Sequence, residues 1–100
     1  MTFGLSSKSW NLIMELAVKP FQAAGCEVWV FGSRARGDHN PFSDIDLLYE
    51  GKTPLSLSLL GRIRTDLEDS DLPIKVDFVD IKELASTYLE QALAERKKIR

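Results

Sequence analysis

Cysteine, long apolar runs and an excess of charge of one sign are all scarce in this 100-residue sequence. The single cysteine, Cys26, excludes an internal disulfide and is expected to be a small apolar residue entering a strand. No apolar run approaches the roughly 20 residues that a membrane-spanning helix needs. Residues 1–10 also lack the basic segment and the long apolar stretch of a signal peptide. We therefore expect a cytoplasmic protein without a membrane segment.

The formal net charge of −2 at pH 7 argues against an extended surface that binds nucleic acid. The one dense basic run, residues 96–98 with Arg100, follows a helical pattern, and its cations are expected to complement the helix dipole. Apolar residues make up 44% and charged residues 28%, as in ordinary soluble proteins. Residues 1–100 are predicted to form a single domain with one modest core and no direct contact with nucleic acid.

The first half of the chain predicts one helix followed by two strands. The apolar residues that recur at helical spacing are Trp10, Ile13, Met14, Ala17 and Phe21. The serine pair Ser6-Ser7 can cap the first turn of this helix, and Pro20 is expected to kink or end it. Residues 26–31 and 44–50 are rich in β-branched and aromatic side chains, and each run predicts a strand.

The second half predicts a helix, a strand and a helix. Thr53 is expected to cap the first of these helices, with Pro54 at its first helical position. A strand is predicted over residues 74–79, and Asp80 begins a capping box for the last helix. The apolar residues expected to face the core from the two helices are Leu60, Ile63, Leu67, Leu84, Tyr88 and Ala92. The pattern predicts an α+β fold, a small mixed β-sheet with helices packed on one face.

Two aspartates, Asp44 and Asp46, open the second predicted strand. Alternation along a strand points both to one face and Ile45 to the other, so two carboxylates share the face that the helices leave open. Their mutual repulsion is unfavourable without a cation, and clustered oxygen ligands suit Mg²⁺ or Mn²⁺. If the third strand lies beside the second, Asp77 completes a three-carboxylate site, whereas Asp80 is expected to cap a helix.

Gly32 and Ser33 end the first predicted strand and lead into a short helix-like segment. Glycine lets the backbone approach a ligand closely, and free N–H groups with a serine hydroxyl form an anion site suited to a phosphate chain. Arg34 and Arg36 are candidate contacts to the phosphates or to a partner, and the alternative is that both are plain solvated arginines. A phosphate site facing a carboxylate cluster indicates metal-assisted nucleotide transfer.

Gly32-Ser33, ten intervening residues and then Asp44-x-Asp46 resemble the signature of the nucleotidyltransferase superfamily typified by DNA polymerase beta. The short length and the forms "GSRARG" and "SDIDL" resemble its minimal nucleotidyltransferase (MNT) branch. The likeness runs from residue 28 to about residue 84 and implies a palm-type fold of the polymerase beta class.

The same resemblance implies roles for individual residues. Gly32 and Ser33 would bind the phosphates of ATP, the nucleotide substrate. Asp44 and Asp46 would bind metal ions, two Mg²⁺ in the family pattern with Mn²⁺ as the alternative. Asp77 would be the third ligand and would activate the attacking hydroxyl.

Members of the MNT branch typically pair with a helical HEPN protein, often a toxin with ribonuclease activity. The resemblance implies an antitoxin that transfers AMP from ATP to a hydroxyl of this toxin, with tyrosine as the first choice. Two alternatives stay open: an antitoxin or nucleotide-binding module that inhibits by contact alone, and an enzyme that modifies a small molecule. The acceptor, the base preference and the oligomeric state, homo-oligomers included, are also open, and His39 is expected to be an exposed loop residue.

Overall fold

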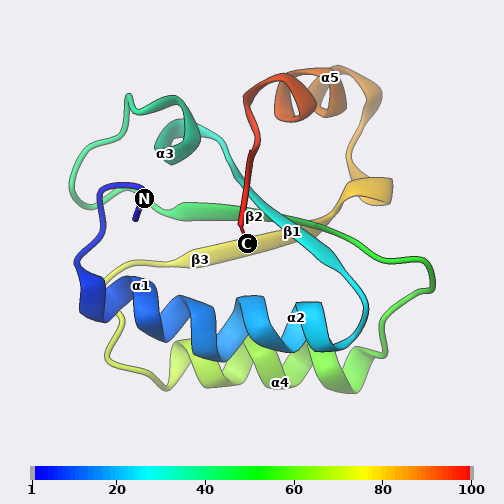
Figure 1. Cartoon of the computed structure of the whole chain (residues 1–100), viewed down its shortest axis with the longest axis horizontal. Coiled ribbons are helices and arrows are strands. Elements are labelled where there is room, and N and C mark those ends of the chain that lie inside the picture. The colour runs from blue at the N-terminus through cyan, green and yellow to red at the C-terminus, as the bar shows by residue number, and fades with distance from the viewer. Residues whose placement is uncertain (1, 100) are drawn as a thin grey trace.

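The computed structural model describes residues 2–99 and contains a four-stranded mixed sheet (Figure 1). The strands lie in the order β3-β2-β1-β4 and are β1 Glu27–Phe31, β2 Ile45–Glu50, β3 Val76–Asp80 and β4 Lys97–Lys98. β1 pairs antiparallel with β2 and β4, and β2 pairs parallel with β3. The predicted α+β class with a small mixed sheet is confirmed. Within the described range, no helix is long and apolar enough to span a membrane.

A nearly continuous helical run precedes β1 and consists of α1 Ser7–Ile13, a π-helical segment Met14–Val18 and α2 Lys19–Ala23. Ser6 caps α1 as predicted, because its Oγ accepts a hydrogen bond from the N–H of Ser9 at 3.1 Å. The helix does not end at Pro20, contrary to one of the two outcomes expected there. Directly before Pro20 the helix has the π pattern, in which the N–H of residue i binds the carbonyl of residue i−5. The carbonyl of residue i−4 is then not in its usual α-helical position, where it would clash with a proline ring.

The helix after β2 is α4, Leu57–Glu68, and it begins three residues later than predicted. The prediction that Thr53 caps this helix is wrong. The cap is Ser56, whose Oγ accepts a hydrogen bond from the N–H of Leu59 at 3.1 Å. Serine is as good a cap as threonine, and Ser56 stands directly before the apolar face of the helix. Ile63 and Leu67 are buried on that face, as predicted.

The helix after β3 is α5, Ser86–Glu95. Asp80 caps a short 3₁₀ turn, Ile81–Glu83, by accepting a hydrogen bond from the Lys82 N–H, so it does not cap α5 itself. Leu84 lies before α5 in extended backbone, which removes the helical spacing that would have placed Tyr88 inward. Tyr88 is 69% exposed, contrary to the prediction, whereas Ala92 is buried as predicted.

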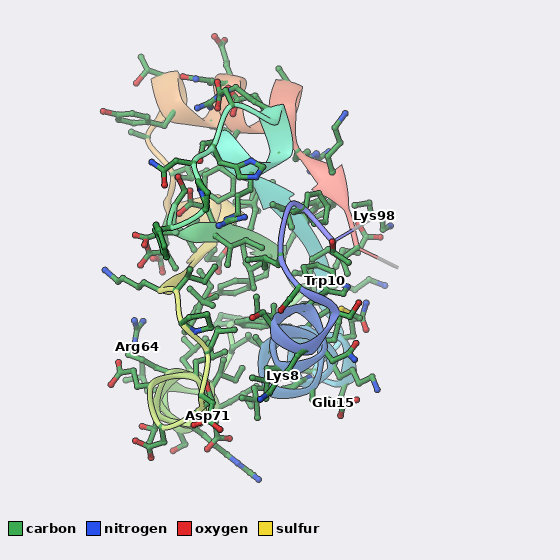
Figure 2. All side chains as sticks on the ribbon, turned by 90° about the vertical axis from the view of Figure 1, so that its left-hand side faces the viewer. Lys8, Trp10, Glu15, Arg64, Asp71 and Lys98 are labelled. Carbon is green, nitrogen blue, oxygen red and sulfur yellow. The ribbon has the colours of Figure 1, made fainter. Side chains whose placement is uncertain are left out.

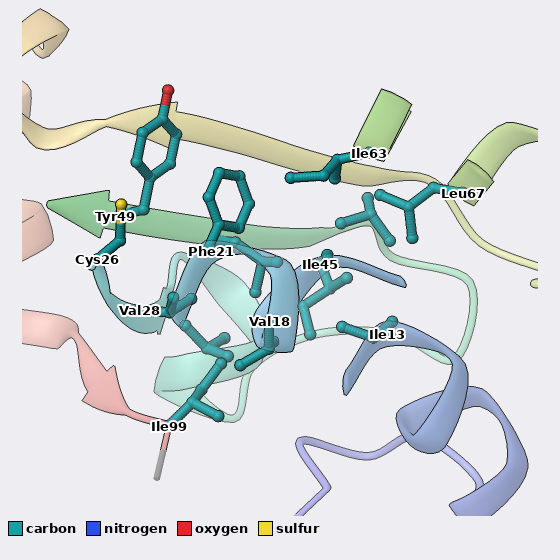
Figure 3. Close-up of a cluster of buried hydrophobic side chains, with 14 of the residues drawn as sticks. Ile13, Val18, Phe21, Cys26, Val28, Ile45, Tyr49, Ile63, Leu67 and Ile99 are labelled. Carbon is teal, nitrogen blue, oxygen red and sulfur yellow. The ribbon is translucent and has the colours of Figure 1, made fainter. Parts of the chain in front are cut away.

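The main core fills the face of the sheet that α1, α2 and α4 cover (Figures 1 and 3). The ring of Phe21, from α2, stacks on Tyr49 with centroids 4.5 Å apart and meets Phe78 at 5.4 Å. The side chains shown around Phe21 in Figure 3 include Ile13, Val18, Cys26, Val28, Ile45, Ile63, Leu67 and Ile99. Helices and three strands therefore contribute to one continuous apolar layer.

A smaller apolar cluster lies on the opposite face of the sheet and is formed by Trp29, Leu48 and Ile81. Leu84 and Leu89, which precede and belong to α5, pack against it. Figure 1 shows α3 and α5 on this side of the sheet, away from α1, α2 and α4. The expectation that helices pack on one face only is therefore corrected: β1 and β2 carry apolar residues on both faces, and the second set also needs cover.

The basic residues 96–98 do not end a helix, contrary to the prediction, and Arg100 lies outside the described residues. The Arg96 guanidinium lies 4.3 Å from the ring centre of Trp29, and Lys97–Lys98 form β4 beside β1. Ile99 follows and is 5% exposed in the main core, with its N–H donating to the carbonyl oxygen of Val28 at 3.0 Å. Burial of Ile99 requires the chain to leave the helix and run along the sheet, which explains the difference.

A surface groove of about 550 Å³ separates α1 from β4. Its lining includes Trp10 and Met14 on the helix side and Lys97 and Lys98 on the strand side. Figure 2 shows Trp10 and Lys98 on the same side of the molecule. An apolar wall therefore faces a basic one at this edge of the sheet.

Candidate functional site

Three aspartates come together where β2 and β3 run side by side. Asp46 of β2 is the register partner of Asp77 of β3, so the two side chains share one face of the sheet. Asp44 stands two residues before Asp46, directly ahead of β2. Ile45, between them, is fully buried on the opposite face. The predicted position of the third strand beside the second is confirmed.

Burial and charge perturb the half-buried Asp46. Burial, together with the negative charges of Asp77 and Asp44, raises the pKa of the Asp46 carboxyl to about 6. The cations Arg36 and Lys75 oppose this rise in pKa. Lys75 also pairs with Asp77, with Nζ and Oδ1 3.4 Å apart. Asp77 and Asp44 are thus close enough to Asp46 to disfavour its charge.

Gly32 is the residue against which Asp46 packs. Its backbone has φ +76°, a conformation that residues with a side chain rarely adopt. A Cβ at this position would lie 2.6 Å from Oδ2 of Asp46, far inside normal contact. Glycine is therefore needed here for two reasons: the backbone conformation of the turn, and the close approach of the Asp46 carboxylate to the backbone.

The short helix α3, Ser33–Arg36, begins directly after Gly32, close to the predicted helix-like segment. The N–H groups of Ala35 and Arg36 both donate to the carbonyl oxygen of Gly32, at 3.1 Å each. The N–H groups of Ser33 and Arg34 come before this first intrahelical bond and point out of the helix end. This turn lies next to Asp46, so donors for an anion face a group of carboxylates.

Arg34 does not lie where a phosphate contact was expected, nor is it solvated. It is 2% exposed, and its guanidinium donates to the carbonyl oxygens of Phe3 at 2.8 Å, Ser43 at 3.0 Å and Pro41 at 3.2 Å. Burial lowers its pKa, and the charge of Asp44 raises it. Arg34 ties the loop between α3 and β2 to the start of the chain.

Arg36 lies at the site and is bound to carboxylates of this chain. Its Nη1 donates to both oxygens of Glu95, at 3.0 Å each, and its Nε donates to Asp38 at 2.9 Å. Glu95 belongs to α5 and also accepts a hydrogen bond from Nε2 of Gln91 at 2.9 Å. No sequence motif includes Glu95, and its distance of 59 positions from Arg36 leaves no local signal for their contact.

His39 is only partly exposed, contrary to the expectation for a loop residue. Its ring packs against Gly4 so closely that a side chain at position 4 would collide with it. Its Nδ1 atom is buried and finds no hydrogen-bond partner among the residues that the structure describes. The ring thus adds to the contacts by which this loop packs on the N-terminal segment.

The oxygen ligands of Asp44, Asp46 and Asp77 have the chemistry that Mg²⁺ and Mn²⁺ prefer. Burial is the larger cause of the raised pKa of Asp46, and the charges of Asp77 and Asp44 add to it. As the side chains stand, no group of three His, Cys, Asp or Glu residues within residues 2–99 is arranged to hold a metal ion. The donor set fits a hard cation, and binding one would require the carboxylates to turn toward it.

Residues 26–100 match the family model described as "Polymerase beta, Nucleotidyltransferase". The probable protein adenylyltransferase MntA of Haemophilus influenzae is 40% identical over 53 residues, which are 53% of this chain and 46% of that protein. MJ0126 of Methanocaldococcus jannaschii, named provisionally as a protein adenylyltransferase, is 35% identical over 66 residues, 66% of each chain. The matched segments therefore cover less than two thirds of these two relatives.

Solved structures give the same fold. One that is named provisionally as a minimal nucleotidyltransferase has a TM-score of 0.71 and 30% identity, over 95% of this chain and 97% of that chain. A crystal structure of a toxin–antitoxin with AMP-PNP has a TM-score of 0.67 over 88% of this chain and 69% of that chain. Its identity is 24%, so this second likeness is one of fold.

Proposed function

This chain belongs to the polymerase beta nucleotidyltransferase family, and from this premise we propose that it transfers AMP from ATP to a hydroxyl of a partner protein. One observation carries the proposal: Asp46 is the neighbour of Asp77 across two parallel strands and packs against the backbone of Gly32. Carboxylates suited to a metal ion thereby adjoin a turn suited to phosphate. The names of the curated relatives support a protein as the acceptor.

The chemistry needs a nucleophile, a leaving group and a place for one proton. The acceptor oxygen forms a bond to the α-phosphorus of ATP, the α–β bridging bond breaks, and pyrophosphate leaves. Asp44, Asp46 and Asp77 are the residues to hold Mg²⁺, which when bound supplies positive charge against the phosphate oxygens. Ser33 and the free N–H groups of its turn orient the phosphates. Asp77 accepts the proton of the attacking hydroxyl.

The partner in this proposal is a helical HEPN toxin, and the acceptor is a tyrosine hydroxyl. A toxin as the partner is suggested by the toxin–antitoxin structure that has the same fold. The alkoxide or phenoxide character that develops in the attack favours a tyrosine, whose hydroxyl is the most acidic among side-chain alcohols. The chain then acts as an antitoxin by covalent modification.

The test mixes the HEPN partner with a sub-stoichiometric amount of this protein, Mg²⁺ and ATP, and follows the intact mass of the partner. Each transfer is expected to add about 329 Da, the mass of one adenylate. Because each modified partner stays modified, far less than one equivalent of this protein should complete the reaction.

The variant Asp46→Asn should lose the transfer, whereas Asp71→Asn, an exposed aspartate in the loop before β3, should keep it. Mn²⁺ in place of Mg²⁺ should support the reaction, and a chelator should stop it. A partner that stays unmodified, yet is silenced at a one-to-one ratio, would favour inhibition by contact instead.

A further inference from the structure

Glu95 places a carboxylate at the same turn where the proposed function needs a phosphate. Both carboxylate oxygens accept from Nη1 of Arg36, and the side chain is 14% exposed. Hydrogen bonds from Gln91 and Arg36 and, more weakly, from the backbone of Gly32 hold the pKa of Glu95 below its ordinary range. A carboxylate of the chain itself therefore occupies the guanidinium of Arg36, which lies beside this turn.

The contact joins two elements that are far apart in the sequence and adjacent in the fold. Glu95 lies in the last turn of α5, and Arg36 ends α3. Figure 1 shows α3 and α5 on the same side of the sheet. Asp38, the other carboxylate on Arg36, binds a different nitrogen, Nε, and is more exposed, at 60%. Glu95 is thus the more enclosed of the two anions on this guanidinium.

Carboxylate oxygens and phosphate oxygens compete for the same donors. Both bind guanidinium and backbone N–H groups through charge-assisted hydrogen bonds. A donor that is already paired with a carboxylate gains little from a second anion unless the first one leaves. Glu95 has a flexible side chain, so it can swing out of the turn while α5 remains in place.

We propose that Glu95 is an internal competitor for nucleotide phosphate at Arg36, beside the Gly32 turn, and that ATP must displace it to bind. This inference rests on the proposed function, because it assigns the turn to the phosphates of ATP. It adds that the affinity for nucleotide is set below its maximum by a residue of α5. Any partner that draws α5 or the Glu95 side chain away would strengthen nucleotide binding.

The direct experiment compares the wild type and Glu95→Gln by calorimetry with Mg²⁺ and α,β-methylene-ATP, an analogue whose α–β bond cannot be broken by AMP transfer. Removing the competing charge should tighten binding about three- to tenfold, because less of the protein is held in the closed state. Glu90→Gln, an exposed glutamate on the same helix, is the matched control and should bind as the wild type does. Thermal unfolding checks that each variant is folded.

Two further variants distinguish competition for Arg36 from a general folding defect of Glu95→Gln. Gln91→Ala removes one hydrogen bond that holds Glu95 in place, so it should tighten binding in the same direction and by less. In the background of Arg36→Ala, the change Glu95→Gln should have much less effect, because the contested donor is gone. A full effect of Glu95→Gln without Arg36 would overturn the competition.

Weaker binding by Glu95→Gln would show that Glu95 instead holds Arg36 in the binding position, and unchanged binding would show that the contact is only structural. Either result overturns the inference. Inorganic tripolyphosphate, used as a second probe, separates this inference from the proposed function. If no AMP transfer is found but Glu95→Gln still tightens tripolyphosphate binding, the competition stands and the proposed reaction fails. If wild type and Glu95→Gln bind neither probe, both are wrong.

Discussion

The face of the sheet under α1, α2 and α4 carries a continuous apolar core, whereas the opposite face combines a small apolar cluster with the aspartates. Both faces are made by the same strands, and Ile45 and Asp46 are consecutive residues. Ile45 is fully buried in the core, and Asp46 is half-buried in a place that raises its pKa. Burial of apolar side chains on the core face stabilises the fold. This stability allows the other face to keep carboxylates that repel one another.

The largest effect should come from the core face. Phe21→Ala removes a ring that is fully buried and stacked on Tyr49, and should lower the free energy of unfolding by about 3–4 kcal/mol. This is a large part of the stability of a small domain. Denaturant unfolding followed by circular dichroism measures it.

The matched control is Leu57→Ala, because Leu57 is 86% exposed at the start of α4. It should change the free energy of unfolding by less than about 0.5 kcal/mol. Equal losses from the two variants would contradict the position of Phe21 at the centre of the core.

A smaller effect on stability, with a specific effect on function, is expected at the turn of the aspartate face. Gly37→Ala forces a side chain into the left-handed helical region and should cost about 1–2 kcal/mol of unfolding free energy. Gly32 has φ +76° and ψ −157°, a region essentially restricted to glycine, so Gly32→Ala should cost at least as much. Only at Gly32 does the new Cβ meet Asp46, while around Gly37 nothing lies within 4 Å. Gly32→Ala should therefore also displace Asp46 and reduce AMP transfer at least about tenfold.

Transfer rates per folded molecule separate the two glycine variants. The same loss of transfer in Gly37→Ala would mean that the conformation of the turn, and not its contact with Asp46, governs activity.

The smallest expected effect has the opposite sign. The pKa of Asp46 is raised from its ordinary value of 3.8 to about 6 in the fold, so ionised Asp46 costs stability above that pH. The cost shrinks as the pH falls from about 6 toward 3.8, and it vanishes only at lower pH, where Asp46 is protonated in both states. Asp46→Asn should therefore stabilise the protein at pH 7.5 by about 1 kcal/mol, after allowance for solvent screening. At pH 4 the gain should fall toward zero.

Thermal unfolding at both pH values, with a chelator present, measures this difference. Asp71→Asn serves as the control for loss of one negative charge and should show no such gain at pH 7.5. A variant Asp46→Asn that is less stable than the wild type at pH 7.5 would contradict the crowding of the three carboxylates.

Much of the aspartate face could be predicted from the sequence, because strand alternation is local. The positions of Asp44, Asp46 and Asp77 follow from a period of two residues and one assumed strand neighbour. The register of β2 and β3 confirms this for Asp46 and Asp77. Whether they bind metal and act in transfer stays a prediction. The sequence predicts that a ligand approaches the backbone of Gly32 closely. In the structure the carboxylate of Asp46 approaches it closely.

Features that depend on distant contacts could not be predicted. Arg34 is buried because three carbonyl groups from two separate segments surround it, and no local pattern signals that. Glu95 pairs with Arg36 only because α5 folds over the second face of the sheet. The charge of Lys97 and Lys98 fits a helix dipole and predicts a helix end, whereas the burial of Ile99 decides their conformation.

The two-residue strand β4 has a consequence for self-association. It covers one edge of β1, whose residues Val28–Val30 are fully or nearly buried and form an apolar, strand-prone run. Left uncovered, such an edge is a template on which a second chain can add a strand and begin an aggregate. With β4 in place, the outermost strand on this side is instead short and carries two lysines, whose like charges repel an approaching copy.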